Sequence, residues 1–455
     1  MQCVAQGVYR PRNPRATDLY ALVEDNFDQL ERVWDERYER QFGFWRPIIR
    51  HVVEQYMDCG DLHCGFARLR CPSCRKDLLL PYSCKRRCCC PSCHQKRALL
   101  FAEHVDEDVL GHVPIRQYVV TIPKMLRLCF KYDRKLLGEL SRCFFDSIKD
   151  LLLDALPQPG VSPTASAALP AMICSIQSYG DDPTRFHPHL HCLVADGLVS
   201  PDGSLLPIPR PYPVQIMLLF RHKLLKSQLA KDKISQRLVD ILLAWRHPGF
   251  SVFQGESVPA DDHASRQRLA RYCVHPPMAV DRLHYDRQTR QVTYDPKSRE
   301  RGAASHSAAS TPCAALDFLA ALCTHIPDAG QQIIRYYGQF SHVRRARARQ
   351  ASPRPPQPAP SPETLAQTAR RTRGSWARLI KKVYEADPLT CPHCSGPLKI
   401  ISLIDAPPVI ERILRHLKLW DRPERAPPPP PPRTLHYDFD PVAGGDAQRW
   451  FQPGE

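Results

Sequence analysis

The sequence predicts an α+β protein built around an antiparallel sheet, and three observations lead to this fold class. Hydrophobic residues make up 43% of the 455 residues, which is enough to bury a sizeable core. The middle of the chain alternates between strand-like and helix-like segments in the order β-α-β-β-α. A cysteine-rich segment precedes this alternation and a proline-rich one follows it, so we expect about three domains.

The N-terminal part of the chain is expected to combine helices with a cysteine-rich module, in a domain over residues 1–110. Residues 18–57 are predicted to be helical, because Asp18 can cap the start and apolar positions then recur at helical spacing. Residues 59–94 are rich in cysteine and have no periodic pattern, and a further helix is expected over residues 95–109.

The sheet is expected in a domain over residues 111–345, where apolar runs end at prolines or polar turns. Strands are predicted over residues 115–122, 171–179 and 187–199, and a hairpin over residues 282–295. Helices are predicted over residues 134–155, 213–244, 262–274, 316–323 and 331–340. The helix over 262–274 can be capped by Asp262 and is stopped by Pro276.

Prolines divide the C-terminal part of the chain, since most of the 46 lie in linkers and a tail. A proline-rich linker is expected over residues 346–369, and a poorly ordered tail over residues 421–455. Between them, residues 370–420 are expected to form a small zinc-ribbon-like module that ends in a helix over residues 408–419.

The charge of the chain favours a polyanionic partner, with nucleic acid first and an anionic membrane surface second. The formal net charge is +16 and the isoelectric point is about 9.1. No run of 18 apolar residues exists, which excludes a membrane-spanning helix of the usual length. Residues 1–17 carry no apolar stretch of the kind that directs secretion, so the 19 cysteines are expected in the reducing cytoplasm, as metal ligands rather than disulfides.

Two CxxC motifs predict a structural zinc site. Cys71 and Cys74 precede Cys90 and Cys93 by fifteen residues, and each motif can present two thiolates from one tight turn. Four sulfur ligands leave no open position, which favours a structural role over a catalytic one. A second site, or exchange of a ligand, is left open by the surplus residues Cys59, His63, Cys64, Cys84, Cys88 and Cys89.

Two further features of the sequence concern a second zinc site and the charge of the first cysteine module. Cys391 and Cys394 form half a site, a possible second zinc whose other ligands are not evident; His416, a shared site and a simple turn remain alternatives. Arg86 and Arg87 place positive charge in the first cysteine module, where they could contact phosphates or simply face solvent.

The segment His187-Pro188-His189-Leu190-His191 predicts a metal site on a strand. Residues two apart on a strand point to one face, so three imidazoles are expected to line up. Two imidazoles leave coordination positions for a third ligand, water and a substrate oxygen. Histidines that only make hydrogen bonds are the alternative.

Tyr272 is a candidate nucleophile for a phosphodiester, provided that a metal polarises the phosphate. It lies on the helix expected over residues 262–274, where Arg268 and Arg271 could neutralise phosphates. The chain has 16 tyrosines, and spacing alone does not select this one over a tyrosine that is half-buried for packing.

Five segments, taken in order, resemble the rolling-circle transposases of the insertion-sequence-91 type, which belong to the HUH class of single-strand nucleases. The name HUH denotes two histidines around a hydrophobic residue. The resemblance covers most of residues 20–420, and its ordered set of motifs is more specific than any one of them. The segments are DCGDLHCGFARLRCPSCRKDLLLPYSCKRRCCCPSC, RFHPHLHCLVADG, RLARYCVHPP, RYYG at residues 335–338, and LTCPHCSGPLKIISL.

The resemblance implies a ferredoxin-like catalytic domain that follows an N-terminal zinc-binding domain. It makes His189 and His191 ligands of a catalytic Mg²⁺ or Mn²⁺, and Tyr272 the nucleophile that forms a 5′-phosphotyrosine. The third metal ligand is left open between His187, Gln177 and an acidic residue elsewhere. The structural Zn²⁺ is assigned to Cys71, Cys74, Cys90 and Cys93.

The chain departs from the two-tyrosine pattern of many relatives, because Arg268 occupies the position four residues before Tyr272. One tyrosine would then act twice, two subunits of a homodimer would cooperate, or a 3′-hydroxyl would complete the reaction. The expected partners are single-stranded DNA at the ends of a mobile element and the target DNA. Two rival functions remain: a relaxase or replication initiator with the same chemistry, and a zinc-bearing DNA-binding protein without nuclease activity.

Overall fold

The structure, a computed structural model, describes residues 13–156, 167–246, 249–295, 312–351 and 390–421. The expected C-terminal tail from residue 422 and most of the expected linker lie outside these residues. Within the described part of the chain, no helix is both long enough and apolar enough to cross a membrane.

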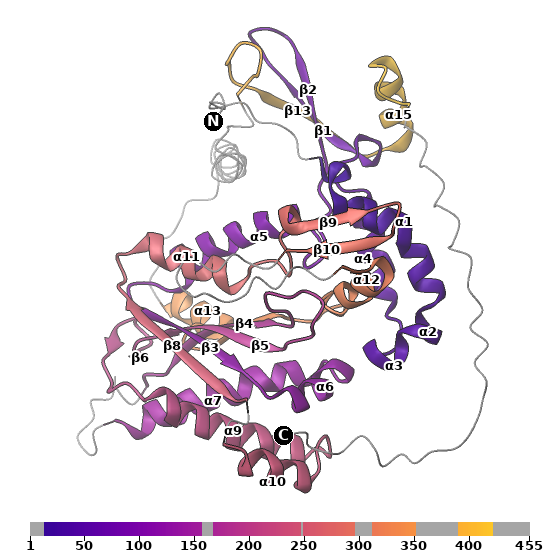
Figure 1. The fold of residues 1–455 in the computed structure, drawn as a ribbon. Helices are drawn as coiled ribbons and strands as arrows, with labels where there is room; N and C mark the ends of the chain where they lie inside the picture. Colours follow the sequence, from indigo (N-terminus) through magenta and orange to yellow (C-terminus); the bar gives the residue numbers. More distant parts are fainter. Residues whose placement is uncertain (1–12, 157–166, 247–248, 296–311, 352–389, 422–455) are drawn as a thin grey trace, which may run out of the picture. The chain divides into compact units, whose positions relative to one another are not determined.

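A five-stranded antiparallel sheet carries the candidate site, with the strand order β12-β4-β5-β3-β8 (Figure 1). All residues of β4 and β5 are buried, as expected for strands that are covered on both faces. The strands are β3 (Ile115–Thr121), β4 (Ala171–Gln177), β5 (His189–Ala195), β8 (Ser251–Val258) and β12 (Ile334–Gly338).

Helices cover both faces of this sheet, and the alternation of side chains along β5 shows which face is which (Figure 1). Leu190 and Cys192 belong to the core beneath the first set of helices, whereas Leu193 and Ala195 belong to the core beneath the second. The first set is α6 (Lys124–Tyr132), α7 (Leu136–Asp154), α9 (Pro213–Leu229) and α10 (Gln236–Ala244); the second is α5 (Pro91–His104) and α11 (His263–Cys273).

The N-terminal helices share a core with a hairpin and a helix that come much later in the chain. The hydroxyl of Thr17 accepts a hydrogen bond from the backbone N–H of Tyr20 and so caps α1. The elements are α1 (Asp18–Arg32), α2 (Trp34–Arg37), α3 (Glu39–Phe42), α4 (Pro47–Met57), β9 (Leu283–Asp286), β10 (Gln291–Tyr294), β11 (Cys313–Ala314) and α12 (Ala315–Cys323). The strands β9, β10 and β11 and the helix α12, which were expected in the sheet-bearing domain, thus pack on the N-terminal helices.

A second, three-stranded sheet joins the two ends of the described chain, with the order β13-β1-β2. Antiparallel pairing connects Phe66 with Ile404 and Arg70 with Lys399. The described part of the expected C-terminal module, residues 390–420, is therefore paired with the cysteine-rich module through β13 and β1, and residues 370–389 lie outside the described residues. The elements are β1 (Phe66–Arg70), β2 (Asp77–Pro81), β13 (Lys399–Ile404) and α15 (Pro407–His416).

Several sequence predictions differ from the structure. The helix predicted over residues 331–340 is wrong, because this segment forms β12, whose Ile334 pairs with Ser175 of β4. The strand predicted over 187–199 begins only at His189 and is followed by the short strands β6 (Leu198–Val199) and β7 (Leu205–Leu206). The start of the expected linker is helical, since α13 spans His342–Ala351.

Candidate active site and metal centres

Two buried histidines lie together at the start of β5. The Nε2 atoms of His189 and His191 are 3.0 Å apart, and the side chains belong to residues that are 6% and 3% exposed. Two neighbouring ligands of an octahedral ion at about 2.1 Å would be about 3.0 Å apart, so this spacing suits a shared cation. Burial lowers the pKa of His189 to about 4 and that of His191 to about 2. Both rings are therefore neutral at pH 7, the form that binds a metal.

Polar atoms without a partner surround this histidine pair. Gln177 lies opposite His189 in the β4–β5 register and is 2% exposed, yet its Oε1 atom has no hydrogen bond. The buried Nε2 atom of His187 also has none, and the ring of His187 is 5.0 Å from that of His189. Buried polar groups usually have a partner, and an ion is one way to supply it. The site therefore fits a divalent cation with Gln177 as a further ligand. The predicted third ligand His187 does not fit this role, because its ring nitrogens do not lie within 4.8 Å of those of both His189 and His191.

Helix α11 brings Tyr272 to the histidine pair. Ala270 and Cys273 pack into the core on the sheet, while Tyr272 between them stays 47% exposed. The rings of Tyr272 and His191 meet edge to face, with centroids 5.1 Å apart. Burial raises the pKa of the phenol from its usual value. The three residues that the sequence singled out from distant segments are thus neighbours.

His275 was missed by the sequence analysis. Its ring stacks on Tyr272, with centroids 5.5 Å apart, and its Nδ1 is 3.2 Å from the Nε2 atom of Gln177. The same Gln177 amide donates to the carbonyl of Cys273 at 2.9 Å. The motif RYCVHPP contained this histidine, but only the turn of the chain after α11 brings it back over the tyrosine.

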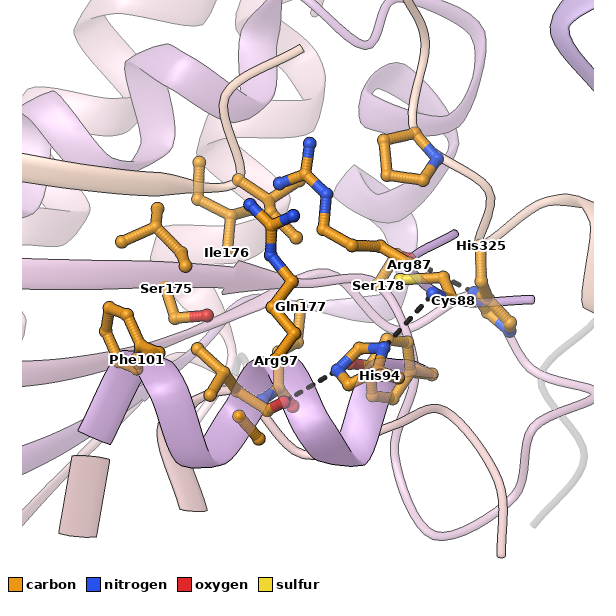
Figure 2. Close-up of a pocket in the computed structure, with 16 residues that line it drawn as sticks. Arg87, Cys88, His94, Arg97, Phe101, Ser175, Ile176, Gln177, Ser178 and His325 are labelled. Carbon is orange, nitrogen blue, oxygen red and sulfur yellow. Dashed lines mark hydrogen bonds between the residues drawn. The ribbon is translucent and has the colours of Figure 1, made fainter. Parts of the chain in front are cut away.

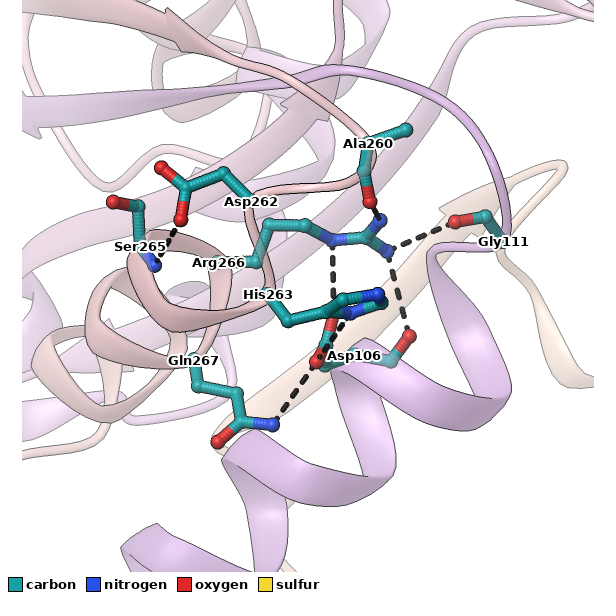
Figure 3. Close-up of polar contacts among 8 residues, drawn as sticks. All are labelled: Asp106, Gly111, Ala260, Asp262, His263, Ser265, Arg266 and Gln267. Atoms are coloured by element: carbon teal, nitrogen blue, oxygen red, sulfur yellow. Dashed lines mark hydrogen bonds and ion pairs between the residues drawn. The ribbon is translucent and has the colours of Figure 1, made fainter.

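A buried polar cluster fixes α11 against the end of α5 (Figure 3). Asp106 lies in a π-helical turn, Val105–Val109, that continues α5. Its carboxylate forms an ion pair with the Nε atom of Arg266 at 2.9 Å, and both side chains are 1% exposed. The Nε2 atom of Gln267 donates to the same carboxylate at 3.0 Å. The helix that carries Tyr272 is thereby held in place.

Replacing Arg266 by methionine is expected to lower the free energy of unfolding by about 3 kcal/mol, because the carboxylate of Asp106 stays buried without its cation. Denaturant titration measures this change. Arg268→Met, on the exposed side of α11, is the matched control and should cost less than about 0.5 kcal/mol. Equal losses in the two variants would contradict the role given to the ion pair.

Four cysteines form a first thiol cluster, cluster I, next to the N-terminus of α5. They are Cys59, Cys84, Cys90 and Cys93. The Sγ atom of Cys59 is 3.8 Å from that of Cys90 and 3.7 Å from that of Cys93. Sulfurs about 2.3 Å from a tetrahedral zinc stand about 3.8 Å apart, so the spacing suits Zn²⁺.

The ionisation of cluster I also favours a cation. Contacts with the sulfurs of Cys84 and Cys90 lower the pKa of Cys59, and contact with Cys59 raises the pKa of both those thiols. Without a cation the negative charge can therefore settle on only one thiolate. A divalent ion removes this limit and allows all four to ligate.

A second thiol cluster, cluster II, joins two matching turns from opposite ends of the chain. It consists of Cys71, Cys74, Cys391 and Cys394. The Sγ atoms of Cys71 and Cys394 are 3.4 Å apart, and those of Cys74 and Cys391 are 3.6 Å apart. The backbone N–H of Cys74 is the main reason that the pKa of Cys71 falls to about 6. A thiolate is therefore available at neutral pH for a metal.

The predicted zinc site of Cys71, Cys74, Cys90 and Cys93 differs from the structure, which divides these residues between the two clusters. The reason lies in the backbone. Arg75 and Ser395 follow their CPxC motifs with φ near +60°, which makes two equivalent turns, whereas Pro91 begins a helix directly after Cys90. His416 and His63 belong to neither cluster; both ring nitrogens of His63 have other partners, Asp61 and the carbonyl of Trp420.

The four arginines predicted to contact DNA have different surroundings. Arg268 and Arg271 are exposed on α11, on the helix of Tyr272. Arg87 lines a groove beside α5. Arg86 instead donates a hydrogen bond to the side chain of Gln55.

Comparison with known protein families gives two matches. Residues 29–122 match a family described as a transposase zinc-binding domain, of the IS91 type, and this range contains all of cluster I and half of cluster II. Residues 171–347 match a family described as a putative transposase, and this range contains the histidine pair and Tyr272. No curated protein and no solved structure gave a match.

Proposed function

The chain belongs to the transposases of the insertion-sequence-91 type, which have an N-terminal zinc-binding domain, and we propose that it nicks and joins single-stranded DNA through a 5′-phosphotyrosine at Tyr272. The observation that carries this proposal is the contact of the Tyr272 ring with His191, in a buried and neutral histidine pair. Exposed arginines on α11 would keep the phosphates of the strand near the phenol.

The topology of the sheet supports an HUH-type, ferredoxin-like domain. Strands β3, β4, β5 and β8 follow one another in the chain, with helices after the first and third, and lie in the order β4-β5-β3-β8. This is the arrangement of a split β-α-β unit. The histidine pair lies on β5, the middle strand of the sheet, and pairing with β4 and β3 on either side restricts the movement of its backbone.

The cation of this proposal would be Mg²⁺ or Mn²⁺, held by His189, His191 and the Oε1 atom of Gln177, which has no hydrogen bond. Such an ion would withdraw charge from the scissile phosphate. The amide oxygen of Gln177 suits a hard cation such as Mg²⁺ or Mn²⁺, whereas imidazole nitrogen is a more borderline ligand, so oxygen atoms of water and phosphate would complete the coordination.

In this proposal Tyr272 is the nucleophile that attacks the scissile phosphate. Its Oη atom would form a bond to phosphorus in line with the bond to the 3′-oxygen, which breaks and leaves a 3′-hydroxyl. The phenol is half-exposed, so its proton can pass to water. The phosphotyrosine keeps the energy of the phosphodiester, and a later 3′-hydroxyl can therefore reverse the step onto new DNA. This makes the activity strand transfer, as rolling-circle transposition requires, rather than hydrolysis.

The cysteine clusters and the matched domain support structural Zn²⁺. In the proposed function the zinc modules grip DNA near the catalytic domain and help to select the end of the element. Cluster I contributes to this geometry because it anchors α5, which packs on α11.

The test is covalent capture on a denaturing gel. Wild-type protein is mixed with single-stranded oligonucleotides from the DNA that flanks the reading frame, labelled at either end, with Mg²⁺ or Mn²⁺. We expect the 3′-labelled strand to move with the protein and the 5′-labelled strand to become a shorter product that a polymerase can extend. EDTA, added briefly before the DNA, should abolish both, and Mg²⁺ should restore them.

Three outcomes would contradict the proposal. Label that migrates with the protein only from the 5′ end would mean the opposite polarity of cleavage. Salt-sensitive binding with no covalent product, from any flanking strand, would favour the DNA-binding protein without nuclease activity. A cleaved strand that rejoins only to itself, and never to a second strand, would favour the relaxase or replication initiator.

A further inference from the structure

A groove of about 760 Å³ lies between α5 and the edge strand β12. Its walls carry the arginines Arg87 and Arg97 and the glutamines Gln331 and Gln332, and the residues that line it include no aspartate or glutamate. Arg335 of β12 contributes to the wall as well, but its guanidinium lies against Gly138 of α7, on the other face of the sheet. Such a composition suits an anionic occupant whose phosphates are bound without base readout.

Arg87 and Arg97 form the positive centre of this groove. Figure 2 shows their guanidinium groups next to each other, above His94 and Gln177. Neither guanidinium makes a hydrogen bond or ion pair within the part of the chain that the structure describes. Burial, and then the charge of Arg87, lower the pKa of Arg97. A phosphate between the two would remove the repulsion that they now exert on each other.

The positive charge extends outward from these two residues. His342 lines the outer part of the groove and begins α13, which carries the exposed Arg344 and Arg347. The ring of Tyr336 in the groove wall is 4.6 Å from that of His342. A row of arginines interspersed with aromatic rings fits an extended polyanion better than a free phosphate, because a single anion needs only one cluster.

A small cavity lies between the inner end of the groove and the candidate active site. A small enclosed cavity of about 30 Å³ shares Arg87 and Arg97 with the groove. The walls of this cavity also include Gln177 and Val274. Gln177 of β4 lies opposite His189 of β5, so this cavity separates the groove from the proposed metal ligands by one layer of side chains.

We propose that this groove, the arginine groove, binds the phosphate backbone of the single DNA strand on one side of the scissile phosphate. The proposal rests on the proposed function, to which it adds a path for the substrate. The groove reads no base sequence, since its contacts are with phosphates, and it contributes affinity that grows with the length of the strand.

The test uses oligo(dT) of increasing length, which needs no knowledge of the cognate ends. Fluorescence anisotropy is measured on the full chain with Tyr272→Phe, so that no cleavage occurs. Arg87→Ala with Arg97→Ala should weaken binding of the longer oligonucleotides at least about tenfold near 0.1 M salt. The slope of log affinity against log salt should fall by about 1.4, for two lost phosphate contacts on a single strand.

The matched control removes two exposed arginines from the α10 region, Arg237→Ala with Arg246→Ala, and should change affinity less than twofold. Arg87→Lys with Arg97→Lys should keep the salt slope, because lysine retains the charge. Equal zinc content and equal melting temperature of all variants would show that each is folded. The proposal is overturned if the alanine variant binds like the control, or if a DNA hairpin loses as much affinity as oligo(dT).

This experiment separates the groove from the nuclease. If the proposal about the groove fails while the proposed function holds, wild-type protein forms the covalent product and the alanine variant binds DNA normally. If the proposed function fails while the groove holds, the alanine variant loses affinity for oligo(dT) although no strand is ever captured by wild-type protein.

Discussion

Tyr272→Phe is expected to abolish covalent capture of DNA, with a loss of at least about a thousandfold, because the change removes the one oxygen that bonds to phosphorus. Affinity for single-stranded DNA should stay within about twofold, since the ring and its contact with His191 are kept. The measurement is the yield of protein-linked 3′-labelled strand, together with anisotropy on the same samples. Tyr132→Phe, also exposed, is the matched control and should retain full yield.

The closest competitor for this role is Tyr179. Its hydroxyl donates to the carbonyl of His275, and the residue is only 4% exposed, so it is ill placed to attack a phosphate. Tyr179→Phe should therefore still form the covalent product. A product that persists in Tyr272→Phe, and disappears in Tyr179→Phe, would move the nucleophile and contradict the proposed mechanism.

A single tyrosine has a consequence for the second half of the reaction. One turn before Tyr272, α11 carries Arg268, which is exposed and donates a hydrogen bond to Ser265. No second phenol can therefore receive the strand on this helix. In the proposed mechanism, transfer within one chain would require that Tyr272 act twice or that a 3′-hydroxyl complete the reaction, and a homodimer would supply a second tyrosine.

The strand of the histidine pair and the helix of Tyr272 could be predicted because the sequence pattern of each is local. His189 and His191 share a face by the two-residue period of a strand, and the helix of Tyr272 is delimited by Asp262 and Pro276. The contact between the histidine pair and Tyr272, in contrast, joins segments that are far apart in the sequence. It depends on the core that Ala270 and Cys273 form on the sheet, which no spacing in the sequence reveals.

The predictions that failed concern pairing between distant segments. The segment of β12 contains tyrosines and isoleucines that fit either a helix or an edge strand, and its pairing with β4 decides the outcome. In the same way, β13 is recognisable only once it pairs with β1, more than 300 residues earlier. The strand β8, with its glycine and mixed polarity, gave no clear pattern.

The grouping of the cysteines failed for a related reason, since closeness in sequence favoured Cys71 and Cys74 with Cys90 and Cys93. All three motifs read CPxC, so the sequence alone does not distinguish them. In the structure, a residue at positive φ follows the second cysteine of CPSCRK and of CPHCSG, whereas Pro91 begins a helix. Cluster II is formed by the two motifs that end in the same kind of turn, and not by the two motifs that are closest in sequence.

Zinc content in double variants separates the two groupings. If the wild-type chain binds two Zn²⁺, Cys74→Ser and Cys391→Ser should each leave one, and the double variant Cys74→Ser with Cys391→Ser should still leave one, because both residues serve cluster II. Cys74→Ser with Cys90→Ser should leave none, because it removes a ligand from each cluster. The measurement is metal analysis of the purified full chain, with Cys143→Ser as the matched control that keeps both ions.

Loss of zinc is expected to lower the free energy of unfolding most at cluster II, because the ion there would link residues more than 300 positions apart. Loss of a structural zinc site removes on the order of 10 kcal/mol of binding energy that folding of a small module uses. We therefore expect Cys391→Ser to expose β13 and β1 to rapid amide hydrogen exchange, while β4 and β5 stay protected. If instead Cys74→Ser with Cys90→Ser retained one zinc, and Cys391→Ser retained two, the four N-terminal cysteines would form one site and the link between the chain ends would be refuted.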